Sequence, residues 1–201
     1  MAKRARGRPR QYTREQAMAG AVDVFSRKGF SGASLDELAL AMDMNRPSIY
    51  NAFGDKEAVY RQALQFFVEH LRAAMRELVI DEPDLKTALT NGYLTALKVY
   101  FAEQPARGCF MFCTAPVEAI NHPDIHADMA ALIEEIDTLF ATRLREAQRA
   151  GHYPPDADIK SMAKLAQGVL HTLAIRARAG ESQASLRKLV KAAVELLCGT
   201  A

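Results

Sequence analysis

The chain has few of the features that would place it outside a cell or in a membrane. It has three cysteines in 201 residues, and three thiols cannot all pair, so a disulfide-stapled scaffold is not indicated. No apolar run reaches the roughly 18 residues that a membrane span needs. The N-terminus is cationic but lacks the apolar stretch of a signal peptide. We therefore expect a cytoplasmic protein that makes no contact with membranes.

Signatures of catalysis are missing as well. The sequence has no nucleophile elbow, no glycine-rich phosphate loop and no HExxH motif. Its five histidines are scattered without a paired acid. We expect no enzyme activity, no cofactor and no bound metal.

Helical periodicity is what the sequence does contain, and no alternating run predicts a strand. The expected fold is all-α with about nine helices, over residues 13–28, 35–42, 46–53, 56–79, 85–102, 109–120, 125–149, 157–179 and 182–198. Two domains are expected: an N-terminal arm with a three-helix domain (residues 1–55), and a larger helical bundle (residues 56–201) that begins with a long helix shared by both.

Residues 29–56 read as two short helices joined by a tight turn. Gly29 suits the end of the first helix of the chain, and Ser34 with Glu37 fits a reciprocal capping box at the start of the next. Residues 43–45 form the predicted turn, with Asn45 as a cap, and Pro47 is tolerated only in a first helical turn. This layout predicts a helix-turn-helix, which places one helix in the DNA major groove.

Basic residues concentrate at the N-terminal end. Residues 1–56 contain ten Lys or Arg against six Asp or Glu, a net charge of +4, although the whole chain is only +2. The remainder is therefore −2. The segment around Gly7 and Pro9 cannot be helical, so Arg8 and Arg10 belong to a predicted cationic arm suited to DNA phosphates or a narrow minor groove.

These residues resemble the DNA-binding domain of the TetR/AcrR family of bacterial transcriptional regulators. The matching elements are Gly29-Phe30, the run from Ser34 to Ala39, and a Tyr-x-x-Phe-x-x-Lys ending from Tyr50 to Lys56. Asp43 departs from the glycine usual in the family's turn, although aspartate tolerates the left-handed region better than most residues. The resemblance implies a homodimeric repressor that binds a palindromic operator in double-stranded DNA.

The predicted DNA contacts follow from position on the two short helices. Backbone contacts are assigned to the arm, to Ser34, Tyr50 and Lys56, and base contacts to the start and outer face of the recognition helix. The complete predicted set is Arg8, Arg10, Ser34, Arg46, Pro47, Ser48, Tyr50, Asn51 and Lys56.

The final two helices carry more apolar surface than one face of a helix requires. Such a surface is either buried within one subunit or shared with a second. The family resemblance implies a four-helix dimer interface made from these helices. The residues predicted for that interface are Val169, Leu173, Leu186, Val190, Val194 and Leu197.

The middle of the chain is rich in aromatic residues, each of which suits a helical core as well as a pocket. The resemblance implies that a small hydrophobic or amphipathic effector binds there and releases the operator, in a cavity of at least about 300 Å³. The predicted contacts are Phe66, His70, Tyr93, Leu97, Tyr100, Phe110, Cys113 and Val117.

Two alternatives stay open. Cys109 and Cys113 lie four residues apart on one helical face, and His122 and His126 follow with the same spacing, so a redox or metal sensor on the same scaffold is conceivable. Against it, free cysteines are usually buried and inert. The second alternative is a DNA-binding protein without a small-molecule input.

Overall fold

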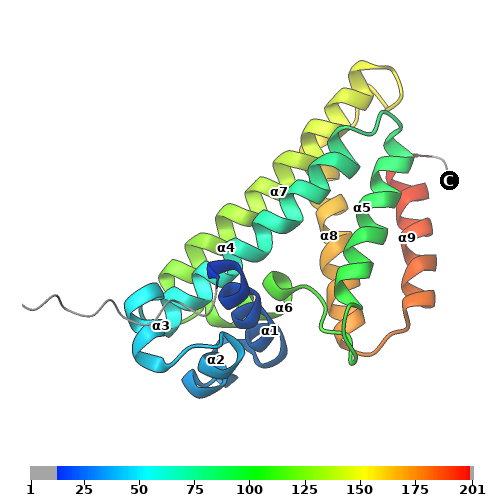
Figure 1. Cartoon of the computed structure of the whole chain (residues 1–201). Coiled ribbons are helices and arrows are strands. Elements are labelled where there is room, and N and C mark those ends of the chain that lie inside the picture. The colour runs from blue at the N-terminus through cyan, green and yellow to red at the C-terminus, as the bar shows by residue number, and fades with distance from the viewer. Residues whose placement is uncertain (1–12, 200–201) are drawn as a thin grey trace, which may run out of the picture. The chain divides into compact units, whose positions relative to one another are not determined.

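The computed structural model describes residues 13–199, and within that range the chain is helical and contains no strand (Figure 1). The elements are α1 (Arg14–Gly32), α2 (Leu35–Ala41), α3 (Arg46–Phe53), α4 (Lys56–Met75), the π-helical turn η1 (Arg76–Ile80), α5 (Leu85–Tyr100), α6 (Phe110–Glu118), α7 (Pro123–Arg149), α8 (Ile159–Arg178) and α9 (Gln183–Leu197). The prediction of an all-α chain with nine helices is confirmed for this range.

The chain divides into two compact units between Phe66 and Phe67, inside α4. The N-terminal unit therefore includes the first half of α4 as well as α1–α3. Its centre is an aromatic cluster in which the rings of Phe25 and Phe30 both meet Tyr60 of α4 edge to face, at centroid distances of 5.0 and 5.4 Å. Such edge-to-face pairs add to the energy of apolar burial, and here they hold α1 against α4.

Close backbone packing joins α1 to α2. Gly20 of α1 lies so near the end of α2 that a Cβ atom placed there would be 2.1 Å from the carbonyl oxygen of Ala41. No side chain fits in that space, so this crossing requires glycine. Nothing in the sequence pattern distinguished Gly20 from other helical residues.

The C-terminal unit is a bundle in which α5, α7, α8 and α9 lie alongside one another, with the short α6 against α7 and α8 (Figure 1). Tyr93 of α5 is fully buried, and its hydroxyl donates to the carbonyl oxygen of Ala166 in α8 at 2.9 Å. Arg143 of α7 is also buried, and its guanidinium donates to the carbonyl oxygens of Glu82 and Pro83 in the η1–α5 connection. Because these buried polar groups have partners, they tie the helices together without an uncompensated desolvation cost.

The predicted fourth helix, 56–79, differs from the structure in its last turn. The α-helix ends at Met75 and continues as the π-turn η1, in which Val79 is fully buried. A Cβ on Gly92 of α5 would lie 2.9 Å from a methyl group of Val79, so the missing side chain of Gly92 makes room for this turn. Helical periodicity alone cannot distinguish a π-turn from an α-helical one.

Candidate functional site

The start of α2 is held by side chains close in sequence. The Ser34 hydroxyl oxygen accepts from the Glu37 backbone N–H at 3.2 Å, and a Glu37 carboxylate oxygen accepts from the Ser34 N–H at 3.0 Å. The Lys28 ammonium also donates to Glu37. Lys28 first, and then the Ser34 donors, lower the pKa of Glu37 to about 2. The predicted capping box is confirmed, and α2 begins at a defined residue.

The turn between α2 and α3 also has the predicted form. Asp43 has a φ of 50°, which places it in the left-handed region, and the Met44 N–H donates to the Ala39 carbonyl at 2.9 Å. The Asn45 side-chain oxygen then accepts from the Ser48 N–H at 2.9 Å, so Asn45 caps α3. Aspartate therefore serves in place of glycine in this turn, because its short polar side chain tolerates a positive φ.

The two faces of α3 differ in burial. Ile49 and Phe53 are buried, whereas Arg46, Pro47, Tyr50 and Asn51 are exposed and Ser48 is half-buried. An eight-residue helix is unstable by itself, so α3 depends on the packing of Ile49 and Phe53. Its outer face is a short polar ridge available to a partner.

Arg46 is ion-paired in the free protein. Its Nε donates to Asp36 of α2 at 2.6 Å, and both side chains are more than half exposed. The hydrogen bond from Arg46 holds the pKa of Asp36 below its usual value. Contact between Arg46 and a base would therefore require this pair to open or rearrange, and sequence spacing did not predict Asp36 as its partner.

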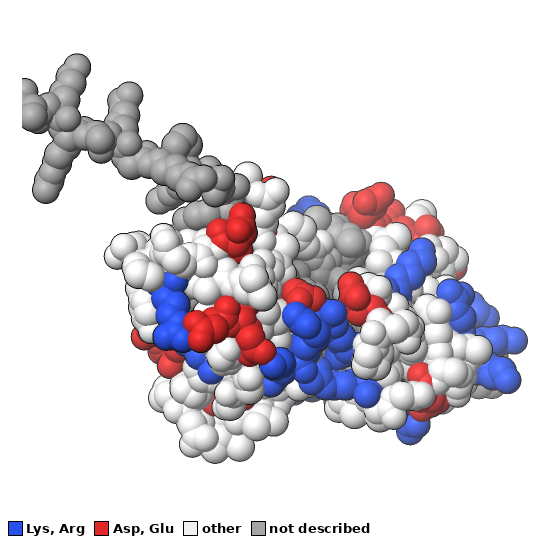
Figure 2. Space-filling view, turned by 60° about the horizontal axis from the view of Figure 1, so that its bottom comes forward, with Lys and Arg blue, Asp and Glu red and all other residues white. Residues whose placement is uncertain are grey.

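Exposed acids neutralise other basic residues of the N-terminal unit. Arg27 pairs with Asp23, as Lys28 does with Glu37. Figure 2 shows acidic and basic side chains adjacent to each other on the face in view. Lys56 begins α4 with its ammonium 4.6 Å from the Phe30 ring centroid, a cation–π contact that fixes its position. The arm residues Arg8 and Arg10 lie outside the described residues.

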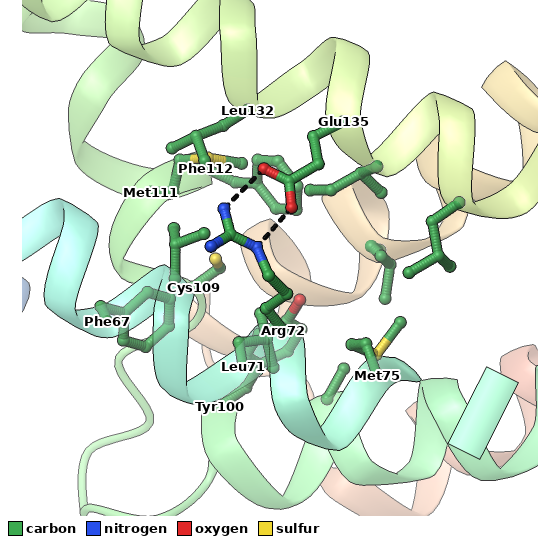
Figure 3. A pocket seen from close by; sticks show the side chains of 15 residues that line it. Phe67, Leu71, Arg72, Met75, Tyr100, Cys109, Met111, Phe112, Leu132 and Glu135 are labelled. Carbon is green, nitrogen blue, oxygen red and sulfur yellow. Dashed lines mark hydrogen bonds and ion pairs between the residues drawn. The ribbon is translucent and has the colours of Figure 1, made fainter. Parts of the chain in front are cut away.

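An apolar cavity of about 60 Å³ lies within the C-terminal unit. Aromatic, methionine and aliphatic side chains from five helices form its wall, together with Cys109 (Figure 3). The lining residues are Phe67, Val68, Leu71, Arg72, Met75, Ala96, Tyr100, Cys109, Met111, Phe112, Leu132, Glu135, Ile136, Leu139 and Leu170. The cavity is much smaller than the 300 Å³ expected from the sequence, because these large side chains fill most of the space between the helices.

One charged pair interrupts the apolar wall. The Nε and Nη2 atoms of Arg72 in α4 donate to the two carboxylate oxygens of Glu135 in α7, at 2.5 and 2.7 Å. Both side chains are about half exposed. The pair therefore lies where the cavity meets solvent, and it joins α4 to α7 through two residues that are 63 positions apart in sequence. Nothing in the sequence pattern signalled either residue.

Among the eight predicted ligand contacts, Tyr100 lines this cavity. Tyr93 and Leu97 belong to the packed core, and Phe110 lies behind the wall, where its ring meets Phe67 edge to face. Three predicted residues lie on or near the surface, since His70 is exposed, Val117 is 68% exposed and Phe66 is half-buried. The α6 face that carries Val117 points to solvent, so this cavity does not account for Val117, and its role as a ligand contact stays a prediction.

The two helical cysteines have different environments. Cys109 is buried beside Tyr100, and burial raises the pKa of Cys109 to about 12. Cys113, the remaining predicted ligand contact, is half-buried near Arg178, and burial also raises its pKa. A thiol that stays protonated at neutral pH is a poor nucleophile. In the described part of the chain no three His, Cys, Asp or Glu side chains group to hold a metal. The structure gives the sensor alternative no support.

Five of the six residues predicted for the dimer interface are buried within their own subunit, at 5% exposure or less, and Val169 is half-buried. The predicted stripe of α9 faces α5 and α8. Packing within one subunit therefore already covers Leu173, Leu186, Val190, Val194 and Leu197, and their assignment to a dimer contact stays a prediction. The opposite faces of the two helices expose large apolar side chains instead, namely Leu165 and Ile175 of α8 and Leu196 of α9, at 59, 57 and 73%. A continuous stripe in the sequence cannot show which side of a helix its own subunit covers.

No helix in residues 13–199 combines the length and apolar character that crossing a membrane would require.

Two family models together cover most of the chain. Residues 17–63 match the model described as bacterial regulatory proteins, tetR family, and residues 87–193 match the tetracyclin repressor-like C-terminal domain. The chain is 26% identical over 192 residues to the HTH-type transcriptional repressor ComR of Escherichia coli K12, which covers 95% of this chain and 90% of ComR.

Solved structures agree with these matches. A cysteine variant of the TetR family transcriptional regulator CifR, in complex with 26-base-pair operator DNA, has a TM-score of 0.84 and 27% identity, covering 94% of this chain and 98% of CifR. A regulatory protein TetR from Rhodobacter sphaeroides has a TM-score of 0.81 over 90% of this chain and 96% of its own, and at 18% identity it supports the fold alone.

Proposed function

This chain belongs to the TetR family of bacterial regulatory proteins and is a DNA-binding transcriptional regulator, and we propose that it acts as a homodimeric repressor of a palindromic operator. The observation that carries the proposal is the outer face of α3. It presents Arg46, Tyr50 and Asn51 to solvent on a helix whose position is set by caps at Ser34 and Asn45. Hydrogen-bonding side chains on a well-positioned helix are what reading of base edges in the major groove needs.

The predicted contacts divide into two classes. Arg46, Pro47, Ser48 and Asn51, at the start and on the exposed side of α3, are assigned to the bases. Ser34, Tyr50 and Lys56 are assigned to the DNA backbone, and so are Arg8 and Arg10 of the arm. Lys56 is suited to a phosphate because it lies at the first residue of α4, where exposed amide groups also favour an anion.

The dimer interface is assigned to the outer faces of α8 and α9. Leu165, Ile175 and Leu196 are large apolar side chains left exposed on adjacent helices, and an isologous contact would bury all three in each subunit. Such a dimer would present two recognition helices to two half-sites of a palindrome.

The experiment is a binding-site selection on random double-stranded DNA, followed by affinity measurements on the selected site. Arg46→Ala should weaken binding by about 1–3 kcal/mol and relax the preference at one base position. Lys56→Ala should weaken binding to all sequences alike and reduce the salt dependence. Arg149→Ala, which removes the same charge from the exposed end of α7, is the control. If Arg46→Ala and Lys56→Ala both bound as tightly as the control, the assignment of α3 to DNA recognition would be wrong.

Control by an effector is the second part of the proposal. A small hydrophobic or amphipathic compound in the cavity would stabilise one conformer of the C-terminal unit, and it would weaken operator binding only if it prefers that conformer. Since α4 belongs to the cavity wall and also runs into the N-terminal unit, it is the element through which this preference would act. Thermodynamic linkage requires the operator to weaken effector binding by the same factor.

The small size of the cavity favours a second candidate, a repressor without any small-molecule input. The two are separated by Ala96→Leu, which places a larger side chain on the cavity wall. An effector-controlled repressor carrying this substitution should bind the operator normally and lose its response. If screening finds no compound that raises the melting temperature of the wild type and weakens its operator binding, the second candidate stands.

A further inference from the structure

The guanidinium of Arg72 has a free edge beside the apolar cavity. Glu135 occupies the Nε and Nη2 hydrogens on one side. The Nη1 atom makes no hydrogen bond to any of residues 13–199, and Figure 3 shows it turned away from Glu135, toward the side on which Cys109 is drawn. A guanidinium can donate two parallel hydrogen bonds from its side, through Nε and Nη2, and two more from its end, through Nη1 and Nη2. Glu135 occupies the side, so the end is available to a second planar oxyanion.

The cavity next to this edge is apolar and of limited size. One water molecule needs a cavity volume of about 10–15 Å³. A cavity of about 60 Å³ therefore holds roughly four to six non-hydrogen atoms. Phe67, Met75 and Phe112 are among its wall residues, and none of them offers a hydrogen bond to a polar ligand. The body of a ligand must therefore be short and apolar.

From these two observations we propose that the cavity takes a short-chain monocarboxylate, with its apolar tail among the α4, α5 and α7 side chains and its carboxylate on the end-on edge of Arg72. The proposal deepens the effector control proposed above by assigning its ligand class. A carboxylate matches the planar fork of arginine with two parallel hydrogen bonds, whereas a neutral amide offers one acceptor and a hydroxyl offers less.

Glu135 has two opposing effects in this arrangement. It holds the Arg72 side chain in one orientation, which lowers the entropy lost on binding. Its negative charge, and that of Glu69 one turn earlier on α4, also repel a ligand carboxylate. Arg72 therefore raises the affinity for a carboxylate ligand, whereas the charge of Glu135 lowers it. If the ion pair served only to hold α4 to α7, loss of either residue would change ligand affinity in the same direction.

The test uses hexanoate as the probe, with hexanamide and hexylamine as matched compounds, and measures binding to the full-length protein by titration calorimetry. Hexanoate should bind the wild type at least about fivefold more tightly than hexanamide. Arg72→Gln should bring that ratio close to one. Arg149→Gln, which removes an exposed arginine charge at the end of α7, should leave the ratio unchanged.

Substitution of the acids provides the sign test. Glu135→Gln keeps an acceptor for Arg72 and removes the repelling charge, so hexanoate should bind about two- to fivefold more tightly. Glu69→Gln should have the same sign and a smaller effect. Equal losses of hexanoate affinity in Arg72→Gln and Glu135→Gln would overturn the proposal, and so would tighter binding of hexanamide or hexylamine, or binding of none of the three.

Operator affinity measured in the same samples separates this inference from the proposed function. If hexanoate binds with the expected dependence on Arg72 but leaves operator affinity unchanged, the carboxylate site stands and effector control through it is rejected. If hexanoate weakens operator binding by the wild type but not by Arg72→Gln, both the carboxylate site and the effector control are supported.

Discussion

The N-terminal unit displays its candidate functional side chains on its surface, whereas the C-terminal unit has its candidate ligand site inside the bundle. In the first unit, the side chains of Ser34 and Asn45 cap two short helices, and each cap bonds to a residue three positions away. The outer faces of these helices remain exposed. In the second, the cavity wall combines residues from Phe67 to Leu170, far apart in sequence. A surface site can therefore depend on local chemistry, but an internal site depends on how all the helices pack.

The largest expected effect comes from aspartate substitutions at two adjacent leucines of α9, one buried and one exposed. Leu197 is 5% exposed and Leu196 is 73% exposed. Leu197→Asp buries a charge in the core of the subunit and should lower the free energy of unfolding by about 3 kcal/mol or more. Leu196→Asp should leave the subunit folded but weaken dimerisation at least about tenfold.

Thermal unfolding measures the first effect and analytical ultracentrifugation the second. A dimer of Leu196→Asp as tight as that of the wild type would show that the outer face of α9 is not the interface.

The next test concerns the packing that holds the N-terminal unit together. Gly20→Ala should destabilise this unit by about 1–3 kcal/mol, because its Cβ would collide with the backbone of Ala41. Gly32→Ala, in the same helix, meets only Lys28 at an ordinary distance of 3.6 Å and should change stability by less than about 0.5 kcal/mol. Chemical denaturation of both variants checks this, and equal stabilities would contradict the close α1–α2 contact.

A smaller effect is expected from the ion pair on the candidate DNA face. Asp36→Asn frees Arg46 and removes a negative charge near the phosphates, so operator affinity should rise about two- to fivefold at low salt, with less effect at high salt. Fluorescence anisotropy with the selected operator measures the change. Weaker binding by Asp36→Asn would mean that the pair positions Arg46 for DNA and does not compete with it.

The smallest effect concerns acid stability. The pKa of Glu37 is lowered to about 2 in the folded protein, below the value near 4.3 of an unperturbed glutamate. The unfolded state therefore binds this proton at higher pH, and the stabilisation, fully present above about pH 4.3, is lost as pH falls toward 2. Glu37→Gln should show a shallower loss of stability over that interval. An unchanged slope would indicate that Lys28 and Ser34 do not hold this carboxylate in solution.

Local chemistry made much of the chain predictable from sequence. The capping box at Ser34, the cap at Asn45 and the positive φ of Asp43 were expected and are present. Each depends on groups within about four residues of one another, so neighbouring side chains suffice to determine it. The buried side of α3 was also predictable, since a short helix with two large apolar residues has one possible inner face.

Packing over long distances decided the rest. The apolar stripe from Leu186 to Leu197 was read as a dimer contact, yet it is buried against α5 and α8, and the exposed face is that of Leu196. Periodicity reveals that a helix has an apolar face but not what covers it. The ion pair of Arg72 with Glu135, the cavity beside it and the close approach at Gly20 likewise join residues of different helices. The sequence by itself determined where most helices begin, turn and end, because caps and turns are local. The π-turn after Met75 is the exception, since it depends on the space left by Gly92 of α5. Only the tertiary structure decided which side chains face solvent, a cavity or each other, because that depends on the simultaneous packing of the helices within each unit.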